Sequence, residues 1–254
     1  MLTPRAVRCI PFTPVFSTAM TSSELARKID HTILKPEATA PEVHRVVAEA
    51  MQHGFASVCI APIWVGRVAA MLRGSGILTS TVVSFPHGTS KPTVKAIEAT
   101  SCIKEGADEI DIVAHLPYLA SLNVDSGRAE LIEIVRAARS TRRDVIIKVI
   151  IESAYLLSSG SDKGEAAIEV ACRAVRESGC DFIKTSTGFH PSGGASLEAV
   201  RLMKQYGDGL FVKASGGIRD LTAALAMIEA GADRLGLSGS VDIVEQLKQT
   251  QSTR

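Results

Sequence analysis

The chain has 254 residues, a length that suits one large barrel domain or two small domains. Hydrophobic residues make up 46% and aromatic residues only 4%, so the core is expected to be aliphatic, as in a buried parallel sheet. A formal net charge of +1 offers no field for nucleic acid or an anionic membrane, and no apolar stretch reaches the ~18 residues of a membrane span.

The first twenty residues differ from the rest of the chain. They contain Arg5, Arg8 and three prolines but no acidic residue. The prolines interrupt the apolar segment that a secretory signal requires, although a transit peptide is an alternative. We expect residues 1–20 to form a flexible N-terminal extension and residues 21–250 to form the catalytic domain.

From Ser22 onward, short aliphatic runs alternate with helical patterns, which is typical of βαβ units. Thr39-Ala-Pro-Glu42 predicts a capping box at the start of a helix. The phrases EGAD (105–108), ESGCD (177–181) and EAGAD (229–233) each predict a helix that ends on a left-handed glycine before an aspartate leads into a strand.

Eight strands are predicted between these helices. Their number, without a linker or a dinucleotide-binding glycine motif after the first strand, favours a closed barrel over an open sheet. The fold class is therefore α/β, a single (β/α)8 TIM barrel. The predicted strands are Ile29–Leu34, Ser57–Ala61, Thr79–Ser84, Glu109–Ala114, Val145–Ile151, Phe182–Ser186, Phe211–Ser215 and Arg234–Ser238.

Four charged residues interrupt consecutive aliphatic strands, from the fourth to the seventh: Asp111, Lys148, Lys184 and Lys213. Such residues are rarely buried unless they are paired, because desolvating a charge costs several kcal/mol. Alternate residues of a barrel strand point to the interior, so these side chains are expected to converge near the carboxyl ends, where barrel active sites lie. The alternative is that each is separately ion-paired or exposed at its tip.

Three lysines beside one aspartate leave an excess of positive charge. Burial and a neighbouring ammonium both lower a lysine pKa, and a neutral amine is the nucleophile of Schiff-base chemistry. No metal is expected, because neither the cysteines (Cys9, Cys59, Cys102, Cys172, Cys180) nor the histidines have metal-binding spacing. A lysine Schiff base would also need no organic cofactor, because its protonated imine is the electron sink. The scattered cysteines indicate a reducing compartment. His87 ends the third strand and is a candidate for the border of the pocket.

Glycine-rich turns with hydroxyl residues follow the last three strands. They are Ser186-Thr-Gly188, Ser215-Gly-Gly217 and Ser238-Gly239. Barrels commonly bind phosphate on backbone N–H groups of late loops, so these turns predict a phosphate site; the alternative is that the glycines only allow tight turns.

Several motifs together resemble the deoxyribose-phosphate aldolase (DeoC) family of class I aldolases over residues 24–247. They are KIDHTILKPEAT, SVCIAP, SFPHG, EIDIVA, KVIIES, FIKTSTGF and VKASGGIR, in that order and spacing. The chain departs from the family at Ala61, in the loop after Ala114 and in the last loop, GLSGS.

The resemblance implies a role for each charged residue. Lys184 would form the Schiff base, Lys213 would tune it, and Asp111 would relay protons through water. Lys148 and Asp30 match the family's barrel lysine and the acid of its first strand. Substrate and phosphate would bind at Thr187, Gly188, Ser215, Gly216, Gly217, Gly236, Ser238 and Gly239.

The implied activity is reversible cleavage of 2-deoxy-D-ribose 5-phosphate to D-glyceraldehyde 3-phosphate and acetaldehyde, in deoxyribonucleoside catabolism. A cytoplasmic homo-oligomer, dimer or tetramer, without nucleic-acid or membrane partners is expected. The alternatives are another Schiff-base barrel aldolase and a catalytically silent relative that binds phosphosugars.

Overall fold

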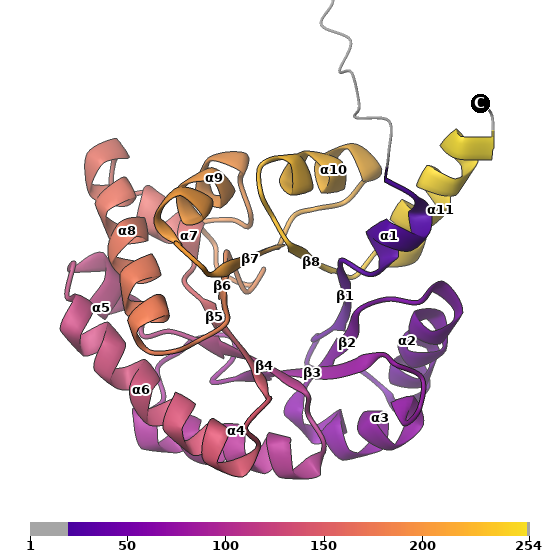
Figure 1. Cartoon of the computed structure of the whole chain (residues 1–254), viewed down its shortest axis with the longest axis horizontal. Helices are drawn as coiled ribbons and strands as arrows, with labels where there is room; N and C mark the ends of the chain where they lie inside the picture. Colours follow the sequence, from indigo (N-terminus) through magenta and orange to yellow (C-terminus); the bar gives the residue numbers. More distant parts are fainter. Residues whose placement is uncertain (1–19, 253–254) are drawn as a thin grey trace, which may run out of the picture.

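Eight parallel strands close into a barrel in the computed structural model, which describes residues 20–252 (Figure 1). Each strand pairs with the next in the chain, and β8 pairs with β1. The predicted TIM barrel is therefore confirmed. The strands are β1 (Ile29–Ile33), β2 (Ser57–Ile60), β3 (Leu78–Val83), β4 (Glu109–Val113), β5 (Ile146–Ile150), β6 (Phe182–Lys184), β7 (Phe211–Ser215) and β8 (Arg234–Leu237).

Helices surround the barrel and follow the strands in turn (Figure 1). No helix of residues 20–252 is both long and apolar enough to cross a membrane. The helices are α1 (Ser22–Ala26), α2 (Ala40–His53), the 3-10 helix η1 (Pro62–Trp64), α3 (Val65–Leu72), α4 (Pro92–Glu105), α5 (Leu116–Ala120), α6 (Val124–Thr141), α7 (Ser153–Leu157), α8 (Ser161–Glu177), α9 (Leu197–Tyr206), α10 (Leu221–Glu229) and α11 (Ser240–Ser252).

The predicted capping box opens helix α2. The Glu42 carboxylate accepts hydrogen bonds from the backbone N–H of Thr39 at 2.8 Å and from its hydroxyl at 2.7 Å. These bonds hold the first turn of the helix, and the helix ends at Gly54, whose φ is +69°.

The three repeated phrases also fix the amino ends of the strands. Their glycines have φ values of +114°, +82° and +114°, which closes each helix as predicted: Gly106, Gly179 and Gly231. The aspartate that follows binds one residue of the preceding strand twice, since its N–H donates to the carbonyl and its carboxylate accepts from the N–H. The pairs are Asp108 with Thr79, Asp181 with Ile147, and Asp233 with Val212.

Most strand ends lie within one residue of the prediction, but β6 stops at Lys184 and not at Ser186. A side chain replaces the backbone ladder there. The Thr185 hydroxyl donates to the Ser215 carbonyl at 3.1 Å and accepts from the Ser215 N–H at 3.0 Å. The sheet therefore opens early, just above Lys184.

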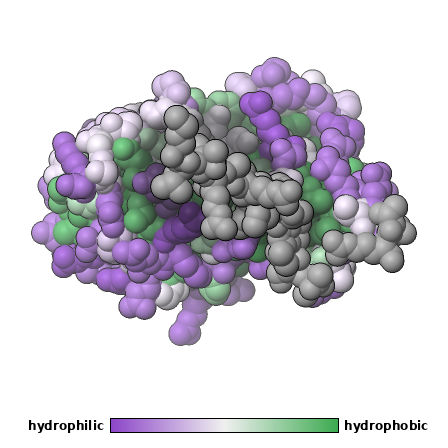
Figure 2. All heavy atoms as spheres, turned by 90° about the horizontal axis from the view of Figure 1, so that it is seen from above, coloured by the Kyte–Doolittle hydropathy of each residue, from purple (hydrophilic) through white to green (hydrophobic). Residues whose placement is uncertain are grey.

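The strands are buried on both faces and their residues are mainly aliphatic, as expected for a barrel wrapped by helices. Polar side chains cover most of the surface shown in Figure 2, with hydrophobic ones scattered among them. Large exposed hydrophobic residues include Ile63, 82% exposed, and Ile97, 69% exposed.

The two ends of the described chain lie together, with α1 beside α11 (Figure 1). The Gln251 amide donates to the Met20 carbonyl at 2.9 Å, and the Met20 side chain packs against the core. Helix α11 continues to Ser252, two residues past the predicted end of the domain. Residues 1–19 lie outside the described residues, so the predicted extension stays a prediction.

Candidate active site

The predicted convergence of strand charges is confirmed, because Asp111 on β4 contacts all three lysines. Its Oδ1 accepts from the Lys148 Nζ at 2.9 Å. Its Oδ2 accepts from the Lys184 Nζ and from the Lys213 Nζ, each at 2.7 Å. All four residues are buried in the barrel.

A second layer of charge lies on the other side of these lysines. Asp30 on β1 pairs with Lys213 and Arg234 and accepts from the Ser57 hydroxyl at 2.8 Å. Glu109 on β4 accepts from Lys148 at 2.6 Å and lies 3.3 Å from the Arg234 guanidinium. Both acidic side chains are fully buried.

Glu109 and Arg234 were not among the predicted site residues. Glu109 lies two positions before Asp111 and therefore on the same face of β4. Arg234 begins β8, two positions before Gly236, which lines the cavity described below. Side chains two positions apart on a strand point to the same face, and this spacing was the signal in the sequence that both residues belong to the site. When Glu109, Asp30 and Arg234 are counted with the four strand residues, four cations face three carboxylates, so the expected positive excess is one charge.

The three lysines differ in how readily they lose a proton. Burial and the Lys213 ammonium lower the pKa of Lys184 below its ordinary value, although Asp111 opposes them. Burial also acts on Lys213 and Lys148, but Asp111 with Asp30 raises the Lys213 pKa, and Asp111 with Glu109 raises the Lys148 pKa. Burial opposes ionisation of Asp111, yet the three lysines hold its pKa well below the usual range.

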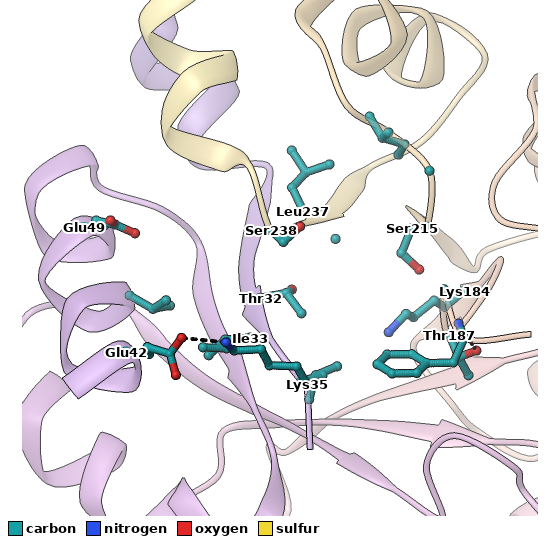
Figure 3. Close-up of a pocket in the computed structure, with 18 of the residues that line it drawn as sticks. Thr32, Ile33, Lys35, Glu42, Glu49, Lys184, Thr187, Ser215, Leu237 and Ser238 are labelled. Atoms are coloured by element: carbon teal, nitrogen blue, oxygen red, sulfur yellow. Dashed lines mark hydrogen bonds and ion pairs between the residues drawn. The ribbon is translucent and has the colours of Figure 1, made fainter. Parts of the chain in front are cut away.

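Lys184 differs from the other two strand lysines in access. It lines a cavity of about 490 Å³ at the carboxyl ends of the strands, whereas Lys148, Lys213, Asp111 and Asp30 do not line it. Figure 3 shows Lys184 reaching toward this cavity, with Ser215 and Thr187 beside it. Helix α2 forms the opposite wall.

Seven of the eight predicted substrate and phosphate residues line the cavity; Gly239 is the exception. His87 is exposed and is not among the lining residues. The seven come from the ends of β6, β7 and β8: Thr187, Gly188, Ser215, Gly216, Gly217, Gly236 and Ser238.

Two of these glycines have positive φ values, which favour glycine, and Gly216 also lies where two loops approach closely. Gly188 and Gly216 have φ values of +82° and +86°, and a Cβ on Gly216 would lie 3.2 Å from the Gly188 Cα. Within the described chain, the backbone N–H groups of Gly188, Gly216 and Gly217 donate no hydrogen bond. Unpaired N–H groups beside a cavity suit an anion.

Glu152, the acid of the KVIIES motif, was also not among the predicted site residues. It is 1% exposed, has a φ of +48°, and its Oε1 accepts from the Thr187 N–H at 2.7 Å. It therefore holds the loop that follows Lys184. An acidic residue directly after an aliphatic strand was the signal in the sequence.

Residues 20–252 contain no group of three or more histidine, cysteine or acidic side chains arranged to hold a metal ion. The four described cysteines, Cys59, Cys102, Cys172 and Cys180, are buried free thiols.

Comparison with known proteins gives a consistent result. A profile of the DeoC/LacD family aldolases matches residues 25–242. The deoxyribose-phosphate aldolase of Kocuria rhizophila is 48% identical over 90% of this chain and 99% of its own length. That of Caldanaerobacter subterraneus is 45% identical over 88% of this chain and 94% of its own. A solved deoxyribose-phosphate aldolase from Aeropyrum pernix, described as tetrameric, superposes with a TM-score of 0.80 at 31% identity, covering 91% of this chain and 93% of that one.

Proposed function

This chain belongs to the DeoC/LacD family of aldolases, and on that premise we propose that it performs its chemistry through a Schiff base on Lys184. The activity is that of a deoxyribose-phosphate aldolase, a carbon–carbon lyase. It reversibly converts 2-deoxy-D-ribose 5-phosphate to D-glyceraldehyde 3-phosphate and acetaldehyde, a step of deoxyribonucleoside catabolism.

One observation carries the choice of nucleophile. Of the three lysines bound to Asp111, only Lys184 lines the cavity, and it is also the one whose pKa is lowered. A Schiff base needs an amine that is both neutral and accessible. Lys35 also lines the cavity, but its hydrogen bond with Glu42 raises its pKa and keeps it charged.

The reaction begins with attack of the neutral Lys184 Nζ on the aldehyde carbon of the open-chain sugar. Loss of water from the adduct gives a protonated imine, which carries a positive charge next to C2. This iminium is the electron sink for the next step, so the cleavage needs no metal or organic cofactor.

Carbon–carbon cleavage follows when the proton leaves the 3-hydroxyl group. Its electrons form the aldehyde of glyceraldehyde 3-phosphate, the C2–C3 bond breaks, and that electron pair forms an enamine with the iminium nitrogen as acceptor. Asp111 lies 2.7 Å from the Lys184 Nζ but does not line the cavity. It therefore takes the proton through a bridging water. Protonation of the enamine carbon and hydrolysis release acetaldehyde and free Lys184.

The remaining charged residues support these steps. Lys213 shares the Asp111 Oδ2 with Lys184, so its ammonium keeps Lys184 neutral and orients the carboxylate. Lys148 holds the other oxygen of Asp111. Asp30 pairs with Lys213 and keeps that lysine charged. The phosphate of the substrate binds the free N–H groups of Gly188, Gly216 and Gly217, with the Ser238 hydroxyl nearby.

Two broader features belong to the same proposal. A phosphosugar enzyme with idle buried thiols suits the cytoplasm. A homo-oligomer, dimer or tetramer, agrees with the tetrameric description of the Aeropyrum pernix relative. Size-exclusion chromatography with light scattering tests it, and a monomer at micromolar concentration would contradict it.

The experiment for the proposed function measures glyceraldehyde 3-phosphate released from 2-deoxy-D-ribose 5-phosphate by the wild type, Lys184→Met and the matched pocket variant Lys35→Met. We expect no release by Lys184→Met and retained release by Lys35→Met. A donor screen with pyruvate and dihydroxyacetone phosphate distinguishes this enzyme from other Schiff-base aldolases. Full turnover by Lys184→Met would overturn the proposal.

A further inference from the structure

We propose that Arg234, at the start of β8, is a positioning residue whose charge makes Lys184 the member of the cluster that gives up its proton. The proposal rests on the proposed function, because it matters only if Lys184 is the nucleophile. Arg234 does not touch the cavity and acts through Asp30 and Glu109.

Arg234 binds two carboxylates that also bind the lysines. Its Nη2 contacts Oδ1 of Asp30, and the other oxygen of that carboxylate, Oδ2, pairs with Lys213. Its Nη1 and Nη2 lie 3.3 Å from the two oxygens of Glu109, whose Oε2 accepts from Lys148 at 2.6 Å. The Arg234 side chain is 13% exposed, whereas both carboxylates are fully buried.

The cluster has no net charge only when one of its four basic groups is neutral. Arg234, Lys148, Lys184 and Lys213 would carry four positive charges against the three of Asp30, Glu109 and Asp111. Releasing one proton makes the charges equal, and burying an unpaired charge is costly. The guanidinium cannot release it, because it stays protonated in proteins.

The choice among the lysines follows from their partners. Lys148 contacts two carboxylates closely, Glu109 and Asp111, and Lys213 also contacts two, Asp30 and Asp111. Lys184 contacts Asp111 alone. Cys59 on β2 is the other ionisable group near Lys184, and burial raises its pKa, so it stays a neutral thiol.

Without Arg234 the fully protonated cluster has no excess charge. Three lysines would then face three carboxylates, so the balanced state has Lys184 protonated and unreactive. Removal of one positive charge at about 10 Å, at an effective dielectric constant of about 20, moves a pKa upward by about one unit. Removal of Glu109 does the opposite, because it leaves four cations facing two carboxylates.

The test is the acid limb of kcat/KM against pH, which reports ionisation of the free enzyme. We expect Arg234→Met to move the limb about one pH unit upward and Glu109→Gln to move it downward. Arg234→Lys keeps the charge and should leave the limb near its wild-type position. Ionisation of the substrate phosphate is common to all variants and cancels in the comparison.

Arg139→Met is the matched control. Arg139 also pairs with a carboxylate, Asp181 at 2.9 Å, and with the Val145 carbonyl at 3.1 Å, but it lies on α6 outside the barrel. It should lower the melting temperature without moving the limb. A purely structural role for Arg234 would give the same result as this control.

An unmoved or downward limb in Arg234→Met overturns the proposal, as does a limb that moves the same way in Glu109→Gln. If Arg234→Met does not fold, Arg234→Gln replaces it: its limb should move upward, whereas that of Glu109→Gln should still move downward. Borohydride trapping of each variant with acetaldehyde separates this inference from the proposed function. Label on Lys184 with an unmoved limb rejects the role of Arg234 alone, whereas label on another lysine rejects the assigned nucleophile.

Discussion

Replacing Lys213 by methionine removes the ammonium nearest to Lys184 while keeping an unbranched side chain of similar length. Lys184 and Lys213 both donate to the Asp111 Oδ2 at 2.7 Å, so their nitrogens lie within about 5 Å of each other. The repulsion between them favours neutral Lys184. In the variant this repulsion is lost, and Asp111 is left with one fewer cation to bind, so its attraction for a Lys184 ammonium grows.

Both effects raise the Lys184 pKa. Two unit charges at about 5 Å, in an effective dielectric constant of about 20, interact by about 3 kcal/mol, which corresponds to about two pKa units. At a pH below the Lys184 pKa, each unit by which that pKa rises lowers the neutral fraction of Lys184 tenfold. We therefore expect Lys213→Met to lose about 100-fold in kcat/KM on the acid side and to recover part of it as the pH rises.

The assay is kcat/KM from pH 5 to pH 10 for the wild type, Lys213→Met and Lys213→Arg. The arginine variant keeps the charge, so its limb should stay near that of the wild type even if its broader guanidinium lowers the rate at every pH. A uniformly lower rate in Lys213→Met with an unmoved limb would refute the electrostatic reasoning. It would mean that Lys213 positions the substrate or transfers protons directly.

Three other predictions concern different parts of the molecule. Lys95 is fully buried and donates to Glu130 at 2.5 Å and to the Val113 carbonyl at 2.6 Å, so Lys95→Met should lower the free energy of unfolding by about 3–5 kcal/mol in urea titrations. Adding Glu130→Gln should recover part of that loss. A decrease in the free energy of unfolding below about 1 kcal/mol for Lys95→Met alone would contradict a stabilising role for this buried ion pair. Gly216→Ala places a Cβ against Gly188 at a positive φ, so KM for 2-deoxy-D-ribose 5-phosphate should rise at least about tenfold. KM for the unphosphorylated sugar should be unchanged. An equal rise in KM for both sugars would show that the phosphate does not bind at this loop. A variant that begins at Met20 should keep its Tm and activity, because residues 1–19 are proposed to form no part of the catalytic domain; a drop of several degrees would show that they pack on it.

The barrel was predictable because its sequence pattern is local. Aliphatic runs alternate with capped helices, and each glycine–aspartate phrase ends one helix and begins one strand. The exact end of β6 was not predictable in the same way. It depends on the Thr185 hydroxyl meeting Ser215 on the neighbouring strand, a contact between residues 30 positions apart.

The candidate site was predictable where a charge interrupts an aliphatic strand, as Lys184 and Asp111 do. Glu109 and Arg234 were not predicted as site residues because each begins a strand, where a charged residue usually faces solvent. Their contact joins β4 and β8 and exists only because the barrel closes. Glu152 was missed although it directly follows an aliphatic run, because the left-handed backbone and the bond to Thr187 that give it a role are not visible in a sequence pattern.

The central claim is that Lys184 forms the Schiff base, and trapping the intermediate tests it most directly. Wild-type enzyme is treated with isotopically labelled acetaldehyde and borohydride, digested, and mapped by mass spectrometry. We predict one labelled lysine, Lys184, with labelling retained in Lys35→Met and absent in Lys184→Met. Label on Lys213, Lys148 or Lys35, or no label under conditions of full activity, would contradict the account.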